Sequence, residues 1–89
     1  LLKIDRAFVS SLEENKKDRA IVQAIITLAE SLELTVVAEG VETLQQANRL
    51  LDLGCELAQG FLFSMPVEAA KAEELLRRET LTAADYVAA

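Results

Sequence analysis

A short apolar run that ends in an acidic residue and a glycine constrains this chain more than any other feature. The run is Val36-Val37-Ala38, followed by Glu39 and Gly40. A continuous apolar stretch of this kind, bounded by a turn signal, is typical of a parallel strand that is buried on both faces. Glu39 would then lie at the carboxyl end of the strand, where ligands and catalytic groups gather in α/β sheets and barrels. The alternative is a solvated charge in a strand–helix loop.

Strand-like and helix-like segments alternate around this run. We predict strands near residues 1–5, 35–39 and 57–61, and helices near residues 18–32, 43–53 and 68–78. Residues 6–17 are expected to form a loop with one turn around residues 8–12, and residues 82–89 to add a frayed turn. Such alternation is typical of right-handed βαβ units with a parallel sheet. The fold class is therefore α/β, with three parallel strands alternating with three helices.

Polar residues and a glycine mark the expected helix ends. Asp18 suits the N-cap of the first helix. Thr43 and Gln46 have the spacing of a capping box at the start of the second helix. Gly54 suits the left-handed position that ends this helix.

Composition argues against several classes of function. A net charge of −6 over 89 residues argues against binding to DNA, RNA or an anionic membrane surface. With Cys55 as the only cysteine and no histidine, these residues cannot build a disulfide framework, a Cys/His metal site or a histidine base. Any metal would need oxygen ligands, as Mg, Mn or Ca do. No apolar stretch has the length of a membrane span and no signal peptide is evident, so we expect a cytoplasmic location.

Each predicted strand carries one polar side chain near its carboxyl end, namely Lys3, Glu39 and Gln59. Because neighbouring strands lie about 4.8 Å apart, these side chains can converge on a space roughly 10 Å across. Taken singly, Lys3 is more often a rim charge and Gln59 a buried amide with satisfied hydrogen bonds. Together, an ammonium, a carboxylate and an amide at equivalent positions favour a site for an anionic substrate. Periodicity leaves the reaction open, because an α/β fold hosts many chemistries.

Four segments of the chain resemble the C-terminal third of the EAL domain family. They are residues 2–9, 37–43, 53–55 and 59–66, and the match runs in one register from residue 1 to about residue 78. The family consists of phosphodiesterases specific for cyclic di-GMP, a bacterial second messenger, and is built on a TIM-like (β/α) barrel. The resemblance therefore implies that the three strands belong to the C-terminal portion of such a barrel.

The resemblance also implies roles for individual residues. Lys3 looks like the active-site lysine near the hydrolytic water, and Glu39 like the strand-end glutamate that binds a metal or water. Gln59, Glu42 and Asp5 look like substrate-binding or supporting residues. The implied reaction is hydrolysis of one phosphodiester of cyclic di-GMP to linear pGpG, with two Mg or Mn ions.

Other parts of the family pattern are absent from these residues. The glutamate of the Glu-Ala-Leu signature, the Asn and Glu metal ligands and the paired aspartates would precede Leu1, so we expect residues 1–89 to be a partial EAL domain that lacks the N-terminal barrel portion. A single carboxylate, Glu39, cannot hold two Mg ions. Glu33 stands where the family often places glycine, which costs about 0.5 to 1 kcal/mol if the backbone there is left-handed.

Two functions remain open at this point. The complete protein is either an active phosphodiesterase or a degenerate domain that acts as a cyclic-di-GMP receptor or protein-interaction module. We expect the 89 residues alone to be inactive. Three strands of a barrel would leave open edges at residues 1–5 and 57–61, so we also expect self-association or pairing with the remainder of the barrel.

Overall fold

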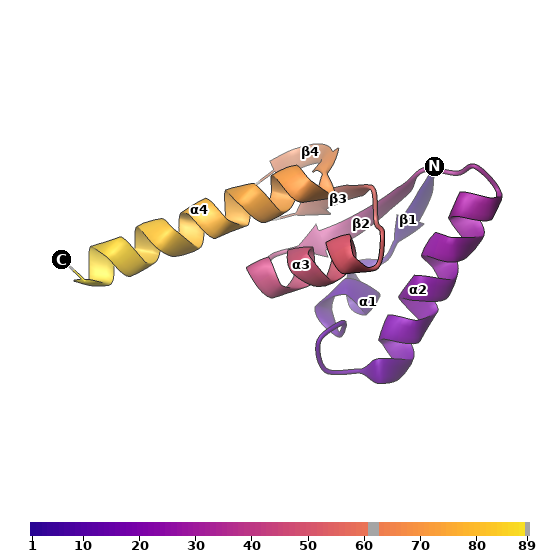
Figure 1. Cartoon of the computed structure of the whole chain (residues 1–89), viewed down its shortest axis with the longest axis horizontal. Helices are drawn as coiled ribbons and strands as arrows, with labels where there is room; N and C mark the ends of the chain where they lie inside the picture. Colours follow the sequence, from indigo (N-terminus) through magenta and orange to yellow (C-terminus); the bar gives the residue numbers. More distant parts are fainter. Residues whose placement is uncertain (61–62, 89) are drawn as a thin grey trace.

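The computed structural model describes the backbone of residues 1–60 and 63–88 and the side chains of residues 1–60 and 65–79. The elements follow one another along the chain as Figure 1 shows. They are β1 (Leu2–Ile4), α1 (Arg6–Ser10), α2 (Lys16–Ser31), β2 (Val36–Val41), α3 (Leu44–Asp52), β3 (Leu57–Gly60), β4 (Phe63–Glu68) and α4 (Ala69–Ala88).

The four strands form one sheet in the order β1-β2-β3-β4. β1 pairs parallel with β2, and β2 pairs parallel with β3, which confirms the predicted parallel units. β4 was not predicted, and it runs antiparallel along the outer edge of β3. The expectation of an open edge at residues 57–61 was therefore wrong for β3, while Phe61 lies outside the described residues.

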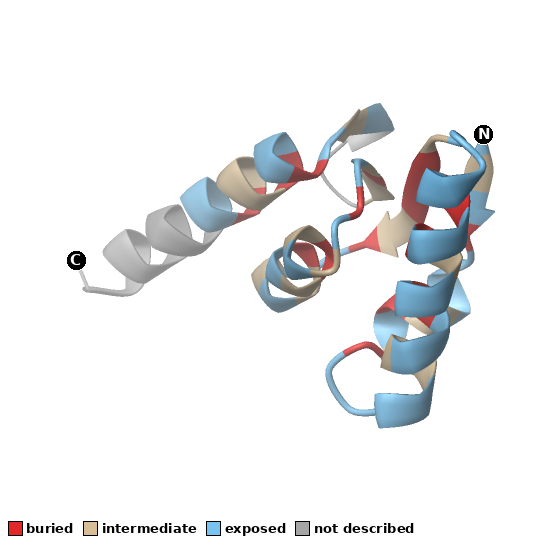
Figure 2. Ribbon diagram, turned by 45° about the vertical axis from the view of Figure 1, so that its right-hand side comes forward, coloured by how far each residue is buried: buried red, intermediate tan, exposed pale blue. Residues whose placement is uncertain are grey.

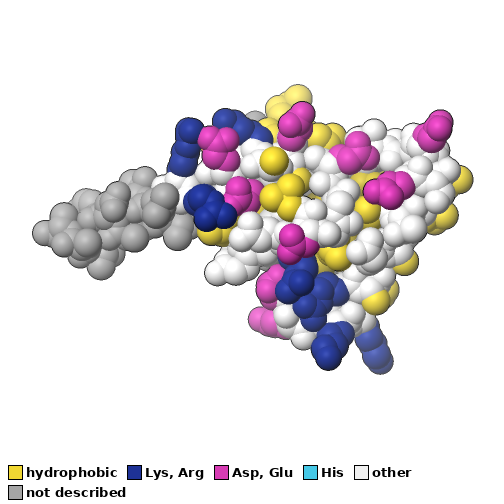
Figure 3. Space-filling model, in the orientation of Figure 1, with side chains coloured by type: hydrophobic (Ala, Val, Ile, Leu, Met, Phe, Trp, Pro, Cys, Tyr) yellow, Lys and Arg dark blue, Asp and Glu magenta, His cyan; other side chains and the backbone are white. Residues whose placement is uncertain are grey.

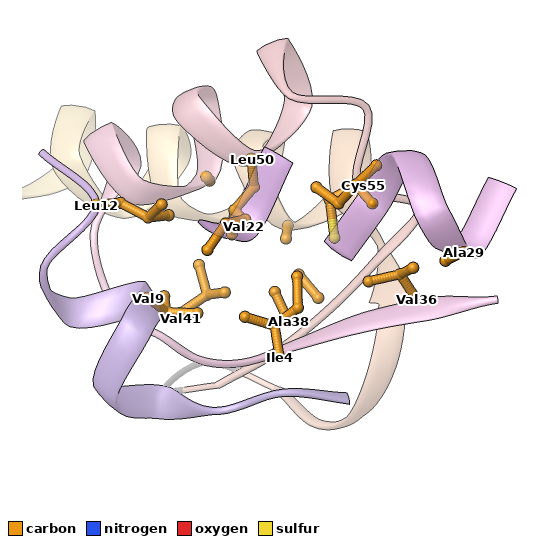
Figure 4. Close-up of a cluster of buried hydrophobic side chains, with 14 of the residues drawn as sticks. Ile4, Val9, Leu12, Val22, Ala29, Val36, Ala38, Val41, Leu50 and Cys55 are labelled. Carbon is orange, nitrogen blue, oxygen red and sulfur yellow. The ribbon is translucent and has the colours of Figure 1, made fainter. Parts of the chain in front are cut away.

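The core lies between the sheet and the helices that cover one of its faces. Figure 4 shows side chains from β1, β2, α2 and α3 pointing toward one another in this layer. The largest fully buried side chains include Ile4, Leu12, Val22, Ile26, Val36 and Leu50. Figure 2 shows exposed residues along the outward side of α2, and the buried residues of α2 and α3 belong to the same core cluster. These helices are held mainly by burial of an aliphatic stripe.

The apolar stripe of α2 is wider than the part of it that the core covers. Val22, Ile26 and Ala29 are buried, whereas Leu28 and Leu32 are each 58% exposed. The sequence pattern predicted the helix but could not distinguish the buried half of the stripe from the exposed half.

The start of α2 differs from the expected one. Asn15, not Asp18, is the N-cap, because the Asn15 side chain accepts hydrogen bonds from the backbone N–H groups of Lys17 and Asp18. The Asp18 carboxylate accepts a hydrogen bond from Ser11 Oγ at 2.5 Å. Asp18 therefore ties the start of α2 to the segment that follows α1.

Both predicted ends of α3 are confirmed. Thr43 and Gln46 form the capping box, with the Gln46 N–H donating to Thr43 Oγ1 at 3.1 Å. Gly54 has a φ of +86°, and the next residue, Cys55, donates its N–H to the Leu50 carbonyl at 2.9 Å. This is the pattern of a Schellman motif.

α2 ends in the same motif but with a different residue at the left-handed position. Glu33 has a φ of +57°, its N–H donates to the Glu30 carbonyl, and the Leu34 N–H donates to the Ala29 carbonyl at 2.8 Å. The expected strain is therefore present, because a left-handed backbone disfavours a residue that has a Cβ.

Two further helical expectations need correction. Residues 6–10 form the short helix α1 instead of belonging to a loop, and Asp5 caps it by accepting a hydrogen bond from the Ala7 N–H at 3.1 Å. α4 continues without interruption to Ala88, so residues 82–88 extend the third helix instead of forming a separate frayed turn. Among the described residues, no helix is both long enough and apolar enough to cross a membrane.

Candidate active site

The strand register brings the three predicted site residues to one face of the sheet. Glu39 on β2 pairs directly with Gln59 on β3, and Lys3 on β1 pairs with Val37, two residues before Glu39. Paired residues of parallel strands share a face, and residues two apart along a strand share it too. Lys3, Glu39 and Gln59 therefore lie on the same face, opposite to the one that carries Ile4 and the helices.

Lys3 and Glu39 form an ion pair on this face. Lys3 Nζ lies 3.5 Å from Glu39 Oε1, and the side chains are 58% and 34% exposed, respectively. A pair this exposed contributes no more than about 1 kcal/mol to folding, because water screens it and two side chains must be ordered. The pair therefore adds little to fold stability, and it lies toward the carboxyl ends of two adjacent strands.

Asp5 and Glu42 stand at the same end of the sheet, with different surroundings. The Asp5 carboxylate is occupied by the N-cap of α1. Glu42 is exposed directly after β2, and its backbone N–H donates to Gln46 Oε1 at 2.8 Å. Asp5 therefore positions the backbone that follows β1, and Glu42 belongs to the junction between β2 and α3.

Arg6 is a further charged residue at this end, and the sequence analysis did not single it out. It follows Asp5 directly, and its side chain lies against Gly40, the residue after Glu39. The available signal was its position two residues after the end of β1, next to the candidate residue Asp5.

The sequence profile of the EAL domain matches residues 1–66, which is 66 of the 89 residues. This chain belongs to the EAL domain family. The match includes every residue placed in the candidate site. The fold class predicted from the sequence, a portion of a TIM-like barrel with three parallel strands, is confirmed, with β4 as an addition.

Among curated EAL relatives, the chain is 49% identical over 83 residues to the cyclic di-GMP phosphodiesterase NbdA of Pseudomonas aeruginosa. That alignment covers 93% of this chain and 11% of NbdA. The chain thus spans about a tenth of this relative.

Solved structures give the same assignment. The phosphodiesterase MucR of Pseudomonas aeruginosa, solved as a complex with cyclic di-GMP, matches with a TM-score of 0.66 and 48% identity over 80% of this chain and 29% of that chain. Klebsiella pneumoniae BlrP1, solved as a manganese/cyclic-di-GMP complex, matches with a TM-score of 0.67 and 42% identity, covering 75% of this chain and 17% of its own.

Glu39 has the chemistry of a ligand for a divalent metal. The Glu39 carboxylate is partly exposed and offers the hard oxygen that Mg or Mn prefers. Among the described residues, no group of three or more His, Cys, Asp or Glu side chains is placed to hold a metal ion. Within the described residues, Glu39 therefore does not form a complete metal site.

Cys55 takes no part in this site. It is 5% exposed and donates its thiol to the Leu57 carbonyl at 3.3 Å. Burial raises the pKa of the Cys55 thiol from 9.0 to about 11, which keeps the thiol protonated near neutral pH. Cys55 is a core residue and not a nucleophile.

Proposed function

We propose that this chain supplies Lys3, Glu39 and Gln59 to the active site of a phosphodiesterase that hydrolyses cyclic di-GMP to linear pGpG. The observation that carries the proposal is the Lys3–Glu39 ion pair, with Gln59 at the same register, on the face that the helices leave free. It is supported by the relatives, since NbdA is a cyclic di-GMP phosphodiesterase and MucR was solved with cyclic di-GMP.

Each residue has a distinct role in this proposal. Lys3 places a positive charge beside the scissile phosphate, and its charge stabilises the negative charge that develops during hydrolysis. Glu39 is the metal or water ligand, and Gln59 orients the ligand by hydrogen bonding. Glu42 and Asp5 support the strand ends that carry these groups.

Two Mg or Mn ions, when bound, would polarise the phosphate and lower the pKa of the attacking water. Among the carboxylates of the candidate site, Glu39 is the one that we assign to these ions, because it shares a sheet face with Lys3 and Gln59 whereas Asp5 caps α1. The remaining ligands, and the cytoplasmic location of the complete protein, stay predictions.

The test is Glu39→Gln in the complete protein that carries these residues. The change removes the ligand charge with almost no change of shape, so kcat/KM for cyclic di-GMP should fall at least about 100-fold. Formation of pGpG is measured with Mg and with Mn. Glu56→Gln is the matched control, because Glu56 is an exposed carboxylate just before β3, at the opposite strand ends, and it should retain normal turnover.

The outcomes separate the two candidate functions. Normal turnover in Glu39→Gln would contradict the assigned role of Glu39. Tight cyclic di-GMP binding by the wild-type protein without formation of pGpG would instead favour the receptor function.

A further inference from the structure

The side chain of Arg6 packs on the backbone of Gly40. A Cβ added at Gly40 would lie 2.5 Å from Arg6 Cγ and 3.0 Å from Arg6 Cβ, so the aliphatic part of Arg6 covers this glycine closely. Gly40 directly follows Glu39, and Arg6 directly follows the Asp5 cap after β1. Arg6 therefore bridges the carboxyl ends of β1 and β2, where the Lys3–Glu39 pair lies.

The charge of Arg6 has no ion-pair partner in the part of the chain that the structure describes. Among the described residues, the Arg6 guanidinium makes no hydrogen bond or ion pair, whereas Arg49 pairs with Glu13 and Arg77 with Glu73. Lys3 is already paired with Glu39. Arg6 thus carries an uncompensated positive charge on a side chain whose stem is held in place.

Residues at this end of the sheet carry charges of both signs, with Lys3 and Arg6 beside Asp5, Glu39 and Glu42. Figure 3 shows Lys and Arg side chains at the end of the molecule where α1 and the start of α2 lie, with Asp and Glu side chains beside them, and a second group of Lys and Arg side chains over α4. The carboxyl end of β1 leads directly into α1 at this end (Figure 1). The charge of Arg6 therefore lies at the end of the sheet that carries the candidate active site.

We propose that Arg6 is a substrate-binding residue that donates hydrogen bonds to a phosphodiester oxygen of cyclic di-GMP beside the Lys3–Glu39 pair. A guanidinium is always charged and presents a planar fork of donors that matches a phosphate. Packing of the stem on Gly40 lowers the entropy lost on binding, because part of the side chain is already ordered. This inference rests on the proposed function and adds to it a residue that sets affinity.

A purely structural role for Arg6 predicts a different result from substitution. If the stem alone matters, a neutral side chain that keeps Cβ and Cγ on Gly40 should behave like arginine. Arg6→Met and Arg6→Gln are such side chains, and Arg6→Lys keeps the charge but loses the fork.

The experiment uses the complete protein and two readouts. KM and kcat are measured for hydrolysis of cyclic di-GMP, and Kd is measured by calorimetry in the Glu39→Gln background, where turnover is suppressed. Arg6→Met and Arg6→Gln should raise KM and Kd roughly 10- to 100-fold, as expected for loss of a charge-assisted hydrogen bond, with kcat changed by less than about threefold. Arg6→Lys should recover part of the affinity. Arg77→Met, which removes the same charge from α4, should leave KM and Kd unchanged.

Wild-type KM and Kd in either folded neutral variant would overturn the inference, as would a loss confined to kcat. If Arg6→Met lowers the Tm, the KM and Kd of Arg6→Gln decide the test.

The role of Arg6 and the phosphodiesterase function can fail separately. A protein that binds cyclic di-GMP without hydrolysing it, and binds more weakly as Arg6→Met, refutes the phosphodiesterase function and supports the role of Arg6.

Discussion

The two faces of the sheet use alternate residues of the same strands for different purposes. On the helix-covered face, Ile4 of β1 and Ala38 of β2 are at most 1% exposed and belong to one aliphatic cluster. On the other face, Lys3 and Glu39 are the immediate neighbours of these residues in sequence, yet they meet as a partly exposed ion pair. Because successive side chains of a strand point to opposite faces, one residue in two can serve folding and the next can serve chemistry.

This comparison predicts where substitutions will act. Changes of buried side chains on the helix-covered face should lower the free energy of unfolding, and changes of Lys3 and Glu39 on the opposite face should alter ligand chemistry with little effect on stability. The free energy of unfolding and the turnover of substituted proteins should therefore depend on the face, or on the helix-ending turn, that carries the substitution.

The largest effect on stability is expected for Leu50→Ala in α3. Leu50 is fully buried in the cluster under the helices, so its truncation removes apolar contacts and leaves a cavity. We expect a loss of about 2 to 5 kcal/mol in the free energy of unfolding, measured with urea. Leu28→Ala is the matched control, because Leu28 is 58% exposed on α2 and should change stability by less than about 0.5 kcal/mol. Equal losses at the two leucines would refute the assigned core.

A second test uses the pH dependence of the same buried face. Because the pKa of Cys55 is about 11 in the folded state and near 9 when exposed, the folded protein keeps this proton more tightly. The contribution of the thiol to stability is therefore complete below pH 9 and is lost as the pH rises toward 11, by roughly 2 to 3 kcal/mol. Unfolding of the wild type and of Cys55→Ala should be compared from pH 8 to 11. Parallel curves throughout would argue against a buried thiol.

The turns that end α2 and α3 offer a smaller, paired test. Both use a left-handed residue, but α2 has Glu33 where α3 has Gly54. Glu33→Gly should stabilise the fold by about 0.5 to 1 kcal/mol, and Gly54→Ala should destabilise it by about 1 kcal/mol. A Cβ at Gly54 would lie 3.7 Å from the nearest atom, Glu30 Oε1, so backbone strain rather than a clash causes the loss. Changes of the same sign at both positions would contradict this account.

The smallest change in stability is expected for Lys3→Met on the opposite face. The Lys3 side chain is 58% exposed, so loss of its ion pair with Glu39 should alter the free energy of unfolding by less than about 1 kcal/mol. The same variant of the complete protein should lose hydrolysis of cyclic di-GMP. A stability loss comparable with that of Leu50→Ala would mean that the pair serves folding.

Alternation along the strands and periodicity along the helices were enough to predict the parallel units and the shared face of Lys3, Glu39 and Gln59. Both patterns depend on residues close together in the sequence, and tertiary contacts did not override the elements that they predict. Thr43 and Gln46 were equally predictable, because a capping box depends only on spacing.

The missed features depend on context that local patterns do not carry. Residues 63–68 contain Pro66, which suggested a break, but β4 is an edge strand, where a residue that lacks an N–H is tolerated. Asp18 and Asn15 are both good N-caps; Asn15 accepts from the first turn of α2, whereas Asp18 accepts from Ser11 outside the helix, and residue type alone does not distinguish these roles. The contact of Arg6 with Gly40 joins residues 34 positions apart, so no local pattern could have indicated it.

The mixed pairing of the sheet also has a consequence for the order of folding. Gly60 pairs with Phe63 across only two residues, whereas Leu2 pairs with Val36, 34 positions further along the chain. A hairpin forms within about 1 to 10 μs, and closing a longer loop costs more chain entropy. We therefore expect the sheet to nucleate at β3–β4 and to add β2 and then β1. Kinetically, truncation of Val67 should slow folding, whereas truncation of Ile4 should mainly accelerate unfolding.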